Sequence, residues 1–78
     1  MSNAVAEHHT VQIRHVYEHL QQNLWQYGRS KQWALIRSEN DYILVPVTDQ
    51  NRERLVASFT FLGIVNRRTT LVDIEDMV

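Results

Sequence analysis

The stretch QWALIRSENDYILVPV, residues 32–47, decides the fold class of this 78-residue chain. Two short runs rich in aliphatic, β-branched and aromatic residues, 32–38 and 42–47, flank the segment Ser38-Glu39-Asn40-Asp41, which is dense in turn-forming residues. This pattern predicts a β-hairpin. Pro46 has no backbone N–H to donate, so we expect it at an edge of the sheet or beside a bulge.

Upstream of the hairpin, apolar residues recur at the spacing of an α-helix. On an ideal helix they share one face: Ile13, Val16, Tyr17, Leu20, Leu24 and Tyr27. Thr10 stands where a residue that caps a helix N-terminus is expected, and Gly28 stands where a glycine that ends a helix is expected. The sequence therefore predicts an amphipathic helix over about 10–27.

The region after the hairpin fits two patterns. As strands, residues 53–65 and 69–75 alternate their side chains, and their Val, Phe and Thr content favours β-structure. As a helix at about 50–62, the first of these segments would be capped by Thr48 or Asp49. We favour the strands, which gives an α+β domain in which the helix packs on a four-stranded antiparallel meander. The alternative order is α-β-β-α-β.

Composition limits the classes of function. The formal net charge of −1 argues against a domain that simply coats nucleic acid or an acidic membrane. Without cysteine, the chain has no disulfide and no thiolate metal site. No apolar run approaches the roughly 18 residues of a membrane span. We therefore expect a soluble, cytoplasmic domain.

The chain is long enough for one small domain. Met1-Ser2-Asn3-Ala4 is typical of a vector-derived tail, so we assign the domain to residues 5–78. A domain of this size buries only roughly 60% of its unfolded surface. Such domains often complete their core by self-association or as part of a larger protein, and both are expected options here.

The sequence contains no complete catalytic set, and we expect neither an enzyme nor a cofactor. The string His15-Val16-Tyr17-Glu18-His19 matches the H-x-x-E-H zinc-peptidase signature, but such a site needs a third ligand and a deep cleft. Both histidines fall opposite the apolar stripe of the predicted helix. We therefore predict no metal site, and keep His15 and His19 as weak candidates for zinc or nickel, helped by His8 or His9.

The strongest functional signal lies on the flank of the predicted helix. Trp25 falls outside the apolar stripe and beside Arg14, Glu18 and Gln21. An exposed indole next to an arginine is typical of an interface hot spot. A single helix also leaves one face of the sheet uncovered. The sequence thus predicts a non-catalytic protein–protein interaction or regulatory domain, which forms a homo-oligomer or docks on a protein partner through these two surfaces.

An alternative function is nucleic-acid binding at the junction between the helix and the first strand. Aromatic and basic residues interleave there, a mixture that can stack on bases and contact phosphates. The candidate residues for this alternative are Arg29, Lys31, Trp33, Arg67 and Arg68.

Overall fold

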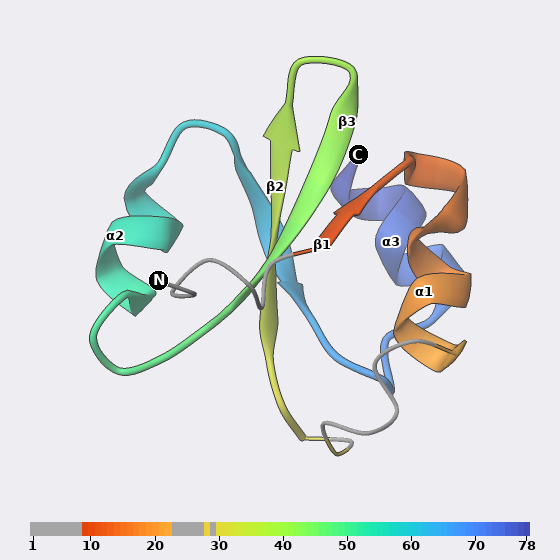
Figure 1. Cartoon of the computed structure of the whole chain (residues 1–78), viewed down its shortest axis with the longest axis horizontal. Helices are drawn as coiled ribbons and strands as arrows, with labels where there is room; N and C mark the ends of the chain where they lie inside the picture. Colours follow the sequence, from red (N-terminus) through yellow and green to blue (C-terminus); the bar gives the residue numbers. More distant parts are fainter. Residues whose placement is uncertain (1–8, 23–27, 29) are drawn as a thin grey trace, which may run out of the picture.

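The computed structural model describes residues 9–22, 28 and 30–78 (Figure 1). In chain order, its elements are β1 (His9–Val11), the 3-10 helix η1 (Ile13–His15), α1 (Val16–Gln22), β2 (Trp33–Ser38), β3 (Asp41–Pro46), α2 (Arg52–Ala57), β4 (Phe61–Val65) and α3 (Leu71–Met77). The described part of the chain is an α+β fold with a four-stranded antiparallel sheet, as predicted. The strand order is β1-β3-β2-β4, which is not that of a meander.

The predicted hairpin is confirmed. Strands β2 and β3 pair antiparallel, and the last pair, Ser38 with Asp41, encloses the turn. Glu39 in this turn has a φ of 38°, in the left-handed region that two-residue hairpin turns use. Pro46 ends β3 beyond the last residue that pairs with β1, so its missing N–H interrupts no described pairing on that side.

The helix predicted over 10–27 begins too early. Thr10 does not cap a helix, because residues 9–11 form β1 and pair with β3. The β-branched side chains of this segment suit a strand, and Val11 is buried in the core. Residues 23–27 of the prediction lie outside the described residues. Gly28 has a φ of 87°, a conformation that favours glycine.

The strand predicted over 53–65 is wrong as a single element, because α2 and β4 divide it. Thr48 and Asn51 exchange two hydrogen bonds: Asn51 Oδ1 accepts from the Thr48 N–H at 2.7 Å, and Thr48 Oγ1 accepts from the Asn51 N–H at 3.1 Å. This turn directs the chain into α2. The alternative, a helix at about 50–62, locates α2 but extends it too far, since Ser58 is extended and ends it (ψ 137°).

The strand predicted over 69–75 is also wrong, because this segment forms α3. Thr70 Oγ1 accepts from the Asp73 N–H at 3.1 Å, and Asp73 Oδ2 accepts from the Thr70 N–H at 3.2 Å. This reciprocal pair is a capping box, which satisfies two backbone donors at the helix start. In so short a segment apolar residues fit both strand and helix spacing, and the cap decides between them.

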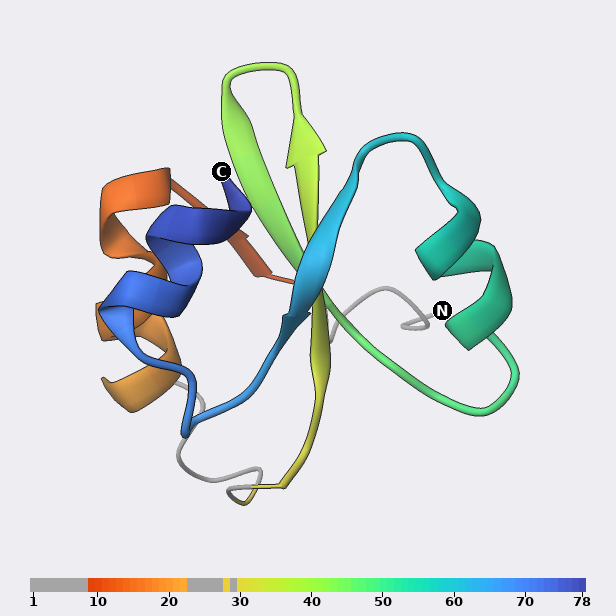
Figure 2. The same ribbon diagram turned by 180° about the vertical axis from the view of Figure 1, so that it is seen from behind.

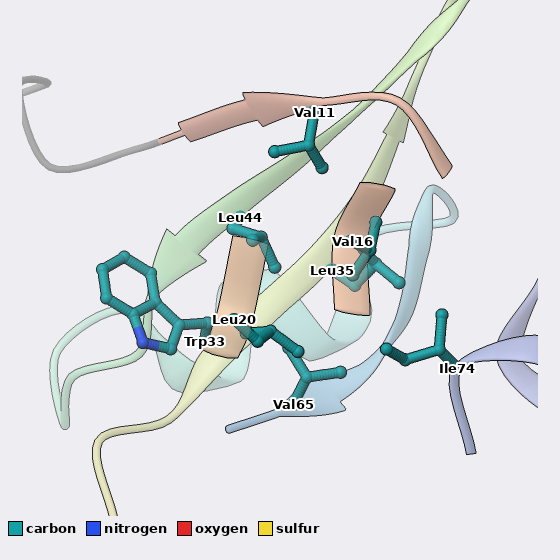
Figure 3. Packing of buried hydrophobic residues seen from close by; sticks show 8 residues of the cluster. All are labelled: Val11, Val16, Leu20, Trp33, Leu35, Leu44, Val65 and Ile74. Atoms are coloured by element: carbon teal, nitrogen blue, oxygen red, sulfur yellow. The ribbon is translucent and has the colours of Figure 1, made fainter. Parts of the chain in front are cut away.

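Helices α1 and α3 cover one face of the sheet, whereas α2 lies on the other side (Figures 1 and 2). Side chains from α1, α3 and the four strands form the core shown in Figure 3: Val11, Val16, Leu20, Trp33, Leu35, Leu44, Val65 and Ile74. The Met77 side chain of α3 packs on Gly63 of β4, and a Cβ at position 63 would lie 2.6 Å from Met77 Sδ, so this side chain would have to move. Among the described residues, no helix has the length and apolar composition to cross a bilayer.

Candidate functional site

An open groove of about 510 Å³ runs along the region where β1 leads into α1. Its walls are mostly polar side chains, contributed by Thr10, Val11, Gln12, His15, Glu18, His19 and Gln22. Because β1 occupies the edge of the sheet beside β3, the chain enters α1 directly from that edge. The groove is therefore built from one continuous segment of the sequence.

The most specific contact at this groove joins two histidines. His19 Nε2 lies 3.1 Å from His9 Nδ1, and the two rings meet edge to face with centroids 4.9 Å apart. Two doubly protonated rings can only donate, so this hydrogen bond requires at least one neutral ring. His9 also packs edge to face against Trp33, with centroids 5.4 Å apart. Trp33 is part of the core, so the His9 ring packs against a buried side chain that restricts its orientation.

Burial and the neighbouring ring both act on His19. Desolvation lowers the pKa of its imidazole, and the electrostatic effect of His9 lowers this pKa further. Both effects disfavour the charged form. The arrangement therefore favours a neutral His19 ring, which can donate to or accept from His9.

The sequence-based metal candidates, His15 and His19, both line the groove. The structure pairs His19 with His9, however, and His15 is exposed. Within residues 9–22, 28 and 30–78, no group of three or more histidine, aspartate or glutamate side chains is placed to hold a metal ion. The zinc-peptidase-like string thus does not assemble a catalytic metal centre from the described residues.

The predicted helix-flank residues have different environments. Arg14 and Glu18 are exposed, and Glu18 also lines the groove. Gln21 is half-buried and donates from its side-chain amide to the backbone carbonyl of Arg67 at 2.7 Å, which ties α1 to the turn after β4. Trp25 lies outside the described residues, so its interface role stays a prediction.

The predicted nucleic-acid candidates come together only in part. Lys31 precedes β2, and Arg67 and Arg68 follow β4. The pairing of Trp33 with Val65 places these segments at the same end of the sheet. Trp33 itself is only 1% exposed, and Lys31 Nζ lies 5.2 Å from the centroid of its ring. A buried indole offers no face to a base, and Arg29 lies outside the described residues.

Two features escaped the sequence-based prediction. Phe59, assigned there to a strand, lies in the turn between α2 and β4 with its side chain 98% exposed. Its exposure follows from the end of α2 at Ala57, whereas both sequence-based alternatives, the strand over 53–65 and the helix at about 50–62, included Phe59. The second is the strand position of His9, which the sequence analysis named only as a helper of His15 and His19, although the β-branched residues that follow it, Thr10 and Val11, indicate a strand.

Comparisons with known proteins add no family to these observations. No protein-family model, curated protein or solved structure matches the chain. Two regions of the chain offer features that could bind a partner or ligand: the His9–His19 pair beside the groove, and the exposed apolar side chains around α2.

Proposed function

We propose that this chain is a non-catalytic protein-interaction domain that self-associates through the side of the sheet occupied by α2. The observation that carries the proposal is Phe59, whose side chain is 98% exposed next to a helix that carries Val56 at 48%. We call Val56 and Phe59 the α2 surface. Exposed apolar groups of this size, close together in the chain, are typical of a contact site.

The helix α2 is itself an argument for a partner. It has six residues and no buried side chain, and Leu55 is only half-buried. Helices this short are marginal without packing, because few backbone hydrogen bonds offset the cost of nucleation. A second molecule placed over the α2 surface would supply the missing packing.

The sheet face on the side of α2 also carries apolar side chains that the monomer does not fully cover. Strand alternation places the side chains of Ile36, Ile43, Val45 and Ile64 on the face opposite the core, and all four are only half-buried. The chain is nearly neutral, so self-repulsion between copies is small. A second copy offers the same apolar surface, which is the requirement for a symmetric dimer.

The test is sedimentation velocity over a range of micromolar concentrations, with Phe59→Ser as the main variant. If Phe59 is an anchor, its loss weakens association by about 2 kcal/mol or more, roughly 30-fold in the dissociation constant. Val72→Ser on α3 is the matched control, because Val72 is 65% exposed on the other side of the sheet. Trp25→Ala tests the helix flank in the same assay.

Two results contradict the proposal. A chain that stays monomeric at hundred-micromolar concentration does not self-associate in the proposed way. Equal effects of Phe59→Ser and Val72→Ser would show that exposed apolar area in general, rather than the α2 surface, drives association.

The alternative function, nucleic-acid binding, has one supporting observation. Arg52 reaches the end of the sheet where β2 begins, since its guanidinium donates to Gln32 Oε1 at 2.9 Å. Lys31, Arg67 and Arg68 lie at this end as well. Such a cluster could contact phosphates, but no stacking platform among the described residues accompanies it, because Trp33 is buried.

A further inference from the structure

We propose that the His9–His19 pair binds one divalent transition-metal ion of the zinc and copper class, with His9 Nδ1 and His19 Nε2 as the two protein ligands. The pair links β1 to α1, and the site is separate from the α2 surface. The site also differs from the His15–His19 pair that the sequence indicated, because its second ligand, His9, comes from β1 rather than from the helical segment.

The separation of the two nitrogens fits a shared ion. They lie 3.1 Å apart. Two nitrogens bound to one zinc at about 2.0–2.1 Å with a tetrahedral angle are about 3.3 Å apart. A hydrogen bond at the same distance needs a proton between the rings. A metal ion bound to both nitrogens would lie off the line that joins them, so both rings would have to turn toward it when it replaces that proton.

The donor atoms favour this class of metal. Imidazole nitrogen suits zinc, copper and nickel, whereas calcium and magnesium prefer oxygen. Metal binding requires the neutral form of each imidazole ring. The core residue Trp33 packs against His9 and restricts its orientation, which reduces the cost of ordering that ligand.

Ligands for the remaining coordination positions of the ion can come from the groove. His19 lines the open groove, so water from the groove can complete the coordination. No third described side chain is already in place. The site is therefore open and exchangeable, and it differs from a closed structural zinc site, which has four protein ligands.

The experiment is calorimetric titration of the tag-free full chain with ZnCl₂ at neutral pH. We expect about one Zn²⁺ per chain. Loss of groups that only support a ligand already costs about 10–100-fold in metal affinity, so His9→Gln and His19→Gln should each weaken binding at least about tenfold. His15→Gln is the matched control, because it removes a histidine from the groove but not from the pair, and it should leave the affinity nearly unchanged.

A second measurement does not depend on variants that fold. In histidine-ring NMR spectra of the unsubstituted chain, Zn²⁺ should shift the resonances of His9 and His19 more than those of His15. The proposal is overturned if no Zn²⁺ binds, if His15→Gln weakens binding as much as His9→Gln does, or if the ring resonances of His15 move instead.

Discussion

The two faces of the sheet are packed in different ways. On one face α1 and α3 bring Val16, Leu20 and Ile74 onto the strands, and all three side chains are buried. On the other face α2 buries none of its own side chains, and Ile36, Ile43, Val45 and Ile64 of the strands stay half-buried, although Ala34 is buried. The difference separates two roles. The first face holds the core of the monomer, and the second is the side through which we propose that copies associate.

The largest expected effect compares neighbouring residues of β2 on the two faces. Leu35 is fully buried in the core, and Leu35→Ala should lower the free energy of unfolding by about 2–5 kcal/mol. Ile36 points to the other face and is half-buried, so Ile36→Ala should cost about half as much or less, because less buried area is lost. Urea denaturation at low protein concentration measures both. Equal losses would mean that the monomer packs both faces equally.

The hairpin was predictable because its information is local. Its strands are joined by a short turn, and the turn residues Ser38-Glu39-Asn40-Asp41 mark the reversal in the sequence. Strand β1 was not, because its partner in β3 lies about thirty residues away and only tertiary pairing defines its register. Composition misled the prediction at α2 and α3. Val, Phe and Thr favour strands, but the capping box of Thr70 and Asp73 starts α3, and the hydrogen-bonded turn between Thr48 and Asn51 precedes α2.

The candidate site shows the same division. The sequence indicated His15 and His19 by their spacing, and both line one groove. It named His8 or His9 as a helper but could not single out the contact between His9 and His19, since that contact depends on the position of β1 at the sheet edge. The exposure of Phe59 depends on where α2 ends, and a strand assignment concealed it.

A middle-sized effect is expected when the helix starts on the two faces are weakened. Thr70→Ala removes the side-chain cap of α3, which covers the core, and should cost about 1 kcal/mol. Thr48→Ala removes the side-chain hydrogen bond to the Asn51 N–H in the turn before α2, a helix that has no side-chain cap of its own. Because α2 contributes no buried side chain, its loosening should change the unfolding free energy less. Thermal unfolding of the two variants tests this. A larger loss for Thr48→Ala would contradict the comparison.

A smaller effect on the unfolding free energy is expected from pH. It arises from His19 of α1, the helix that covers the first face. The pKa of His19 is lower in the folded chain than its ordinary 6.5, mainly through burial and then through His9. The unfolded state therefore binds more protons near this pH, so this contribution to stability is present above pH 6.5 and is lost as the pH falls below it. Solvent exposure keeps the loss below about 1 kcal/mol. Unfolding curves from pH 8 to 5 should show the loss in the unsubstituted chain and less of it in His19→Gln.

The smallest effect is expected for nucleic acid, which would need a third surface, at the end of the sheet. Lys31 and Arg68 lie there, but the chain has a formal net charge of −1, and Trp33 is buried. Phosphate contacts alone give binding that weakens steeply with salt. In a fluorescence-anisotropy titration with single-stranded RNA, we therefore expect little binding at physiological salt and little change in Arg68→Ala. Salt-dependent binding that both Lys31→Ala and Arg68→Ala weaken would show that phosphate is recognised at this end, independently of the two faces of the sheet.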